Sequence, residues 1–160
     1  MPRGLVTLGH VAVPAALGRS GRRAIKREGD GATPIGRWML RRILYRADRL
    51  SRPRTGLPIR PIRPDDGWCD AAGDPLYNRP VQHPYGASAE RLWREDGLYD
   101  IIGVLSHNER PRVRGGGSAI FLHVARPGLS PTEGCVAVPL ATLIRLLGRL
   151  RRGAALIVHA

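Results

Sequence analysis

The chain has 160 residues, a length that favours one domain, and we expect a single domain over residues 1–160. Its formal net charge is +13, almost all of the positive residues are arginine, and its 20 glycines and 14 prolines exclude a helical bundle or a coiled coil. No apolar run approaches the roughly 18 residues that a membrane-spanning helix needs. Two cysteines make neither a dense disulfide scaffold nor a zinc site, so we expect no bound metal.

The chain begins with two short apolar runs, residues 4–8 and 11–17. Gly9 and His10 between them suit the two-residue type II′ turn of a β-hairpin, so we expect two paired strands. The stretch is only mildly apolar and no convincing cleavage site follows it. We therefore interpret it as folded protein rather than as a secretory signal.

The middle of the chain alternates polar segments with β-prone runs. Residues 22–36 are rich in turn formers and predict a loop, with a turn at 33–36, and residues 38–45 predict a strand. Residues 51–90 are dominated by Pro, Arg, Asp and Gly, but their aromatic side chains favour an ordered insertion. Residues 89–94 predict one short helix.

The last third of the chain carries the clearest patterns. Residues 99–106 and 118–124 are compact apolar runs that predict buried neighbouring strands. From Pro139 onward, leucine and isoleucine recur at helical spacing and predict a helix whose last turn is rich in arginine, and residues 154–158 predict a final strand. The expected fold class is mainly β, with one or two short helices, one of them near the C-terminus.

The sequence indicates a possible cysteine nucleophile with a histidine base. His123 lies at the end of a predicted strand, and Cys135 follows it after a short loop. A thiol attacks a carbonyl only as a thiolate, and at a pKa of roughly 8.5 it needs a base, which the histidine can supply. Gly134 lets the backbone turn, so that the amides of Gly134 and Cys135 can bind an oxyanion. Spacing alone leaves open the alternative that Cys135 and His123 have only a structural role in the core. Cys69 has no histidine in a comparable context, and we assign it to packing.

These residues carry a resemblance to a known family. His123 followed by Thr132-x-Gly134-Cys135 resembles the His…(Ser/Thr)-x-Gly-Cys signature of the L,D-transpeptidase catalytic domain, the YkuD-type family. Residues 26–36 are similar to the Thr-Pro-x-Gly block that precedes it in that family. The resemblance covers nearly the whole chain.

The resemblance implies a β-sandwich catalytic domain that needs no cofactor and acts on peptidoglycan stem peptides. Cys135 would attack the carbonyl of the third residue of a tetrapeptide, release D-alanine, and pass the acyl group to an amine in a 3→3 cross-link. Transfer to water would make the protein an L,D-carboxypeptidase. In this assignment His123 is the base and then the acid, and the Gly134 and Cys135 amides are the oxyanion donors. The residues expected to contact substrate are Thr132, Arg126 and Ser118.

Two features leave alternatives open. Many family members carry an arginine two residues after the cysteine, where this chain has Ala137, so Arg126 or an arginine within 52–94 would have to replace it. The imidazole of His123 also needs a partner to orient it. Asp100, His107 or a backbone carbonyl could provide that contact.

Other classes of function fit the sequence less well. A net charge of +13 attracts nucleic acid, but aromatic residues are only 5% of the chain and the arginines are scattered, so we expect no nucleic-acid partner. A cell-wall-binding domain without activity is a further alternative. Asp66 and Asp70 could suggest a paired-carboxylate hydrolase, but they lie in a proline-rich loop. We expect a monomer in the periplasm or cell envelope, although no export signal is visible. The histidines expected at the surface or in turns are His10, His83 and His159.

Overall fold

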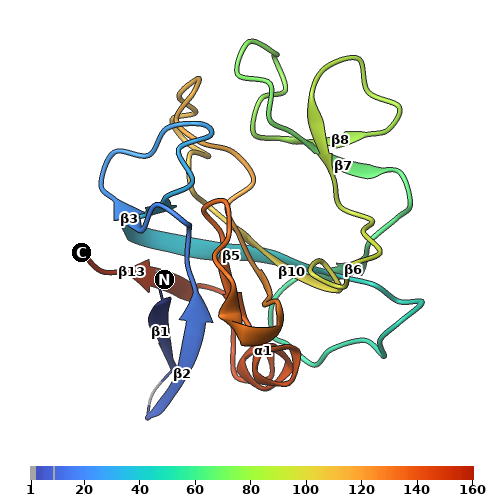
Figure 1. The fold of residues 1–160 in the computed structure, drawn as a ribbon. Helices are drawn as coiled ribbons and strands as arrows, with labels where there is room; N and C mark the ends of the chain where they lie inside the picture. The colour runs from blue at the N-terminus through green and yellow to red at the C-terminus, as the bar shows by residue number, and fades with distance from the viewer. Residues whose placement is uncertain (1–2, 9) are drawn as a thin grey trace.

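The structure, a computed structural model, describes residues 3–8 and 10–160. Its largest sheet is built from β1 (Arg3–Leu8), β2 (Val11–Ala16), β5 (Gly36–Tyr45), β6 (Ile59–Pro61), β10 (Ile101–Leu105), β11 (Phe121–Val124), β12 (Val136–Val138) and β13 (Ala155–Val158). The strand order is β1-β2-β12-β11-β10-β5-β13, with β6 paired to β5 (Figure 1). Most neighbours are antiparallel, but β11 with β12 and β5 with β6 are parallel.

Two smaller sheets and two short helices complete the fold. A three-stranded sheet has the order β8-β7-β9, formed by Pro80–Gln82, Asp66–Cys69 and Ala89–Arg91, and β3 (Arg22–Arg23) pairs with β4 (Thr33–Pro34). The helices are α1 (Leu140–Leu147) and the single 3-10 turn η1 (Pro127–Leu129). Strands hold 37% of the residues and helices 7%, which confirms the predicted mainly β, sandwich-type fold with a short helix near the C-terminus.

The main sheet buries side chains on both faces, and β10 shows why. Ile101 and Leu105 belong to the core cluster that contains the buried leucines of α1, whereas Ile102 and Val104 belong to a second cluster with Trp68 of β7. This alternation follows from the two-residue period of a strand. Figure 1 accordingly shows α1 on one side of the β5–β10 layer and β7 with β8 on the other.

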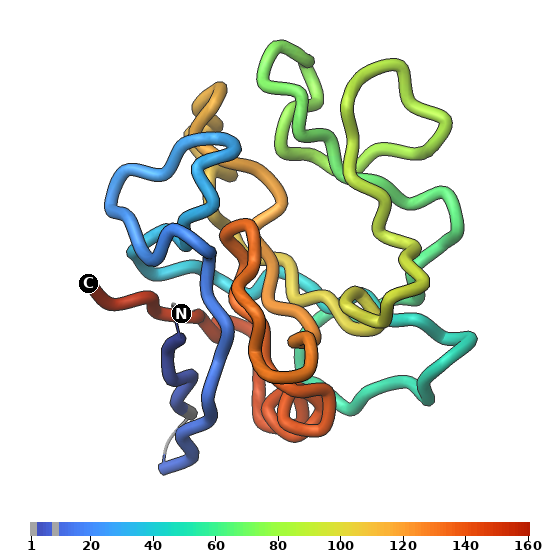
Figure 2. The backbone as a smooth tube through the Cα atoms, in the orientation of Figure 1, coloured from blue at the N-terminus to red at the C-terminus, as the bar shows by residue number. Residues whose placement is uncertain are grey.

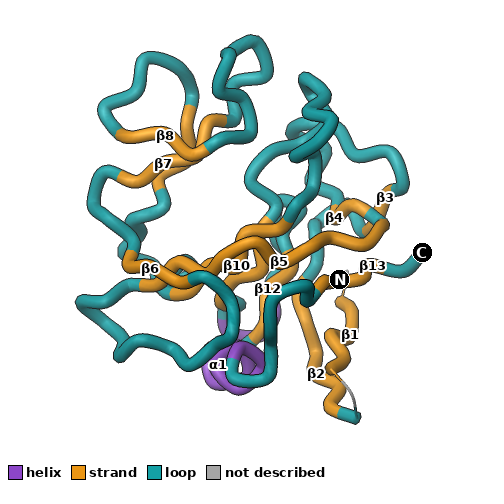
Figure 3. Tube along the Cα trace, turned by 180° about the vertical axis from the view of Figure 1, so that it is seen from behind, coloured by secondary structure: helices purple, strands orange, loops and turns teal. Residues whose placement is uncertain are grey.

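The main sheet is strongly curved. Although β1 and β13 lie at opposite ends of the strand order, Figures 1 and 3 show them close together. Residues of both strands line one cavity of about 220 Å³. Figure 2 shows the loops that surround β7 and β8, in green, on the side of the main sheet opposite α1.

Most of the predicted elements are confirmed. The first two strands pair antiparallel, although the predicted turn at Gly9 lies outside the described residues. The predicted strands near 38–45 and 154–158 are β5 and β13, and the runs at 99–106 and 118–124 form the antiparallel neighbours β10 and β11. The predicted loop at 22–36 holds only the two-residue strands β3 and β4.

Two local predictions are wrong. Residues 89–94 form no helix, because β9 pairs with β7 and places Glu90 opposite Trp68. This long-range pairing outweighs the local helix propensity. The C-terminal helix also ends earlier than predicted, at Leu147, because the following chain turns back and the Leu150 carbonyl accepts a hydrogen bond from the Gly56 N–H at 3.0 Å.

Candidate active site

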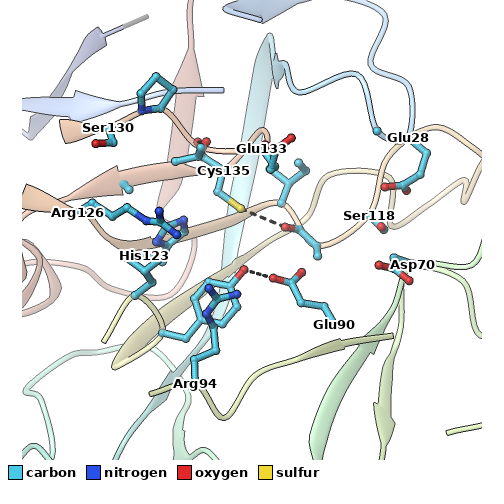
Figure 4. Close-up of a pocket in the computed structure, with 18 of the residues that line it drawn as sticks. Glu28, Asp70, Glu90, Arg94, Ser118, His123, Arg126, Ser130, Glu133 and Cys135 are labelled. Carbon is cyan, nitrogen blue, oxygen red and sulfur yellow. Dashed lines mark hydrogen bonds between the residues drawn. The ribbon is translucent and has the colours of Figure 1, made fainter. Parts of the chain in front are cut away.

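Cys135 and His123 line the same pocket because Cys135 directly precedes β12, the parallel neighbour of the strand β11 that carries His123. In the register of β11 and β12, His123 lies opposite Ala137, two residues after Cys135. Side chains two residues apart on a strand share a face, so the strand period turns both groups to the same face of the sheet. Both line a pocket of about 400 Å³, and Figure 4 shows their side chains in it.

The thiol of Cys135 is buried and is held by backbone groups. Its Sγ lies 3.2 Å from the Ala119 carbonyl, to which the S–H donates, and it accepts a hydrogen bond from the Phe121 N–H at 3.4 Å. Burial, with the charge of Glu90 as a second cause, raises the pKa of Cys135 to about 12. The thiol of Cys135 is therefore neutral at pH 7, and no hydrogen bond joins it to His123 within the described part of the chain.

A backbone carbonyl orients the imidazole of His123. Its Nδ1 lies 2.8 Å from the Val124 carbonyl oxygen, so Nδ1 carries the proton and Nε2 is left as the basic nitrogen. Of the side chains considered from sequence, Asp100 is bound by Arg49 at 2.9 Å and His107 contacts the Gly116 carbonyl, so neither orients His123. Burial lowers the pKa of His123 to about 4, which keeps the ring neutral at pH 7.

The loop before Cys135 is closed by Thr132. The Thr132 hydroxyl donates to the Cys135 carbonyl at 2.6 Å and accepts from the Gly134 N–H at 3.1 Å. This corrects the expectation that both amides are free for an oxyanion, because the Gly134 N–H is already bound inside the loop. The Cys135 N–H has no acceptor among the described residues and is left as the backbone donor.

Gly134 is required by its backbone conformation and by its surroundings. Its φ is +136°, a region that L side chains rarely adopt, and a Cβ there would lie 2.8 Å from the Ala32 carbonyl oxygen. We expect Gly134→Ala to lower the free energy of unfolding by about 1–3 kcal/mol and to displace the thiol. Chemical denaturation and thiol-labelling rates would measure both effects. Gly73→Ala, which meets no atom within 4 Å, is the matched control.

Two arginines line the pocket, whereas position 137 holds an alanine. Ala137 is buried. Ala137, Arg94 and Arg126 all line the pocket. Arg94 donates to Asp96 at 3.0 Å, and the guanidinium of Arg126 lies 4.0 Å from the same carboxylate. The Arg126 side chain is 58% exposed, so it is free to bind a ligand at the rim.

The other predicted substrate contacts, Ser118 and Thr132, also line the pocket. Asp66 does not share the pocket with Asp70, because Arg60 binds Asp66 at 2.7 and 3.2 Å, whereas Asp70 lines the pocket. Cys69 is completely buried, and burial raises the pKa of its thiol.

Sequence reasoning missed the residues that the 51–90 segment and its neighbours bring to the pocket. The missed acidic ones are Glu28 and Glu90, whereas Asp70 was considered only in a pair with Asp66. The Tyr99 ring packs edge-on against His123 with centroids 5.3 Å apart. Strand β9 positions Glu90 through its pairing with β7. The only available signal was composition, because acidic residues are rare in this basic chain.

Neither a metal centre nor a membrane helix was found in the part of the chain that the structure describes. Its His, Cys, Asp and Glu side chains form no group of three or more that could hold a metal ion. No helix among the described residues is long and apolar enough to cross a membrane.

Comparison with known proteins identifies one family. The family model of the YkuD L,D-transpeptidase catalytic domain matches residues 6–158 of the 160-residue chain. Comparison with curated proteins and with solved structures gave no significant match.

Proposed function

The chain belongs to the L,D-transpeptidase catalytic-domain family, and from that premise we propose that it is a cysteine acyltransferase acting on peptidoglycan stem tetrapeptides. Its product would be a 3→3 cross-link. The observation that carries the proposal is the shared pocket, which is lined by the buried thiol of Cys135, directly before β12, and by the neutral imidazole of His123 on the parallel neighbour β11. A merely structural cysteine has no need of a pocket or of a neighbouring base.

Acylation would couple transfer of the Cys135 thiol proton to Nε2 of His123 with attack by the sulfur. The sulfur attacks the carbonyl carbon of the third stem residue, and the negative charge that develops on its oxygen is stabilised by the Cys135 N–H. When the C–N bond breaks, the imidazolium returns its proton to the departing D-alanine amine. A thioester and a neutral His123 remain.

The reaction starts from a neutral pair rather than from an ion pair. A thiol pKa of about 12 and an imidazole pKa of about 4 leave almost no thiolate in the free protein. Thiolate must therefore form as substrate binds and the sulfur begins to attack, which is general-base catalysis. This arrangement protects the buried thiol from reaction with other electrophiles between turnovers.

Arg94 and Arg126 are suited to bind the carboxylate of the stem peptide. Both line the pocket, and the guanidinium fork matches a carboxylate in shape and charge. Because peptidoglycan lies outside the cytoplasmic membrane, we also propose that the protein acts in the cell envelope, as a monomer, and that its positive charge favours these acidic stems over nucleic acid.

The direct test is incubation with a purified disaccharide tetrapeptide, followed by mass spectrometry of protein and products. We expect D-alanine release, a thioester adduct on the peptide that contains Cys135, and 3→3 dimers. The Cys69 peptide is the internal control and should stay unmodified, because its thiol is completely buried. Absence of any adduct, or an adduct on Cys69 alone, would contradict the proposal.

A further inference from the structure

Glu90 lies in the pocket but has no role in the acylation steps above. It lines the same cavity as Cys135, and its Oε1 accepts a hydrogen bond from the Tyr99 hydroxyl, drawn as a dashed line in Figure 4. Among the described residues its second oxygen, Oε2, has no hydrogen-bond partner. One oxygen of the carboxyl group is thus anchored and the other is available to a ligand.

The anchor of Glu90 is itself rigid. The Tyr99 ring packs edge-on against Phe121, at 5.9 Å between centroids, as well as against His123. On the other side, strand pairing fixes the Glu90 backbone opposite Trp68. The carboxyl group is therefore held in a fixed position relative to the base of the reaction.

Charged side chains are unevenly distributed around Cys135. Figure 4 shows Glu28, Asp70 and Glu90 on one side of Cys135 and Arg126 on the other, with Arg94 near Glu90 and Glu133 next to Cys135. Oδ1 of Asp70 is buried without a hydrogen-bond partner in the described part of the chain. A ligand that places a positive group on the acidic side and a carboxylate on the basic side would match this arrangement.

The environment also makes Glu90 a stronger base than an exposed glutamate. Burial raises the pKa of Glu90, and the charges of Asp70 and Glu28 raise it further, against the lowering effects of Tyr99 and Arg94. A carboxylate whose pKa is shifted toward neutrality is better matched to accepting a proton from an ammonium group.

We propose that Glu90 binds the primary ammonium group of the acyl acceptor and removes a proton from it, so that the free amine can attack the Cys135 thioester. The inference rests on the proposed function and concerns its second half, the transfer step. In this inference, Glu90 is the residue that makes the acyl-enzyme react with an amine in preference to water.

The proton and electron balance of the step is complete with groups in the pocket. The acceptor R–NH₃⁺ gives one proton to the Glu90 carboxylate, and the nitrogen lone pair forms a C–N bond with the thioester carbon. His123 takes a second proton from the attached nitrogen, the C–S bond breaks, and the imidazolium returns that proton to the leaving thiolate. Amide, free thiol and neutral histidine result, and Glu90 releases its proton to solvent.

The test measures partition of the acyl-enzyme between amine and water. Wild type, Glu90→Gln, Tyr99→Phe and Glu95→Gln are supplied with disaccharide tetrapeptide, and D-alanine release, cross-linked dimer and hydrolysed tripeptide are quantified. For Glu90→Gln we expect the dimer-to-tripeptide ratio to fall at least about tenfold, while the thioester adduct on Cys135 still forms. Tyr99→Phe, which keeps the ring but removes the anchoring hydroxyl, should lower the ratio by about threefold.

The control and the contrary outcomes are well separated. Glu95→Gln removes the same charge outside the pocket, from a side chain that is 81% exposed. This variant should keep the wild-type dimer-to-tripeptide ratio. A ratio within about twofold of wild type in a folded Glu90→Gln protein overturns the inference, and an unchanged ratio in Tyr99→Phe does so if Glu90→Gln fails to fold. A wild type that only hydrolyses its acyl-enzyme also overturns it. Absence of any acyl-enzyme in wild type instead refutes the proposed function.

Discussion

Replacing Cys135 with serine is expected to eliminate the acyl-enzyme and to lower muropeptide turnover by at least about a thousandfold. The hydroxyl is a far weaker acid than the thiol. A base whose pKa is lowered to about 4 cannot deprotonate it effectively. Intact-protein mass spectrometry and D-alanine release measure the two effects.

The fold should survive this substitution. Serine is slightly smaller than cysteine, and its hydroxyl can donate to the Ala119 carbonyl that now accepts from the thiol. Cys69→Ala serves as the control, because Cys69 does not line the pocket and its loss should leave turnover unchanged. Full turnover in Cys135→Ser would remove the thiol from the mechanism.

Replacing His123 with alanine should have the second largest effect, a loss of about 10²–10⁴ in the acylation rate at pH 7. Without the imidazole, the reaction depends on thiolate formed by the buried thiol alone. With a pKa of about 12, that thiol is almost fully protonated at pH 7. Pre-steady-state measurement of D-alanine release would give the rates.

The pH profiles should distinguish this role from a structural one. His123 loses its basic lone pair only when pH falls toward its pKa of about 4, so the wild-type rate should be level from mildly acidic pH upward. In His123→Ala the rate should rise about tenfold per pH unit, because thiolate increases in that proportion below the thiol pKa. The difference between the two proteins therefore narrows as pH rises. Parallel profiles would show that the imidazole is not the base.

The sequence predicted those parts of the site that depend on local pattern. The two-residue period of the strands is sufficient to bring Cys135 and His123 to one face, and the signature around them indicates the chemistry. The bond from the Gly134 amide to Thr132 could not be predicted in this way, because it depends on a hydroxyl rotamer in a three-residue loop.

The far wall of the pocket could not be predicted for a different reason. Glu90 reaches it only because β9 pairs with β7, more than twenty residues earlier, and local propensity there favours a helix. Tyr99 is placed by the strand that follows it and by its contact with Phe121. Contacts between distant segments carry no local signature, so they have to be observed in the folded chain.

Lys26 is the only lysine of the chain, and its side chain is 4% exposed, with its ammonium group bound to Asp30 and, at 2.9 Å, to the Arg27 carbonyl. Every other positive side chain at neutral pH is a guanidinium, which stays protonated and is not a nucleophile. Lys26 also lines the pocket that holds Cys135. If the protein transfers acyl groups to amines as proposed, its one side-chain amine is held in an ion pair instead of being left free to compete for the acyl group. Self-modification, the natural hazard of such chemistry, is thereby limited by composition and by this ion pair.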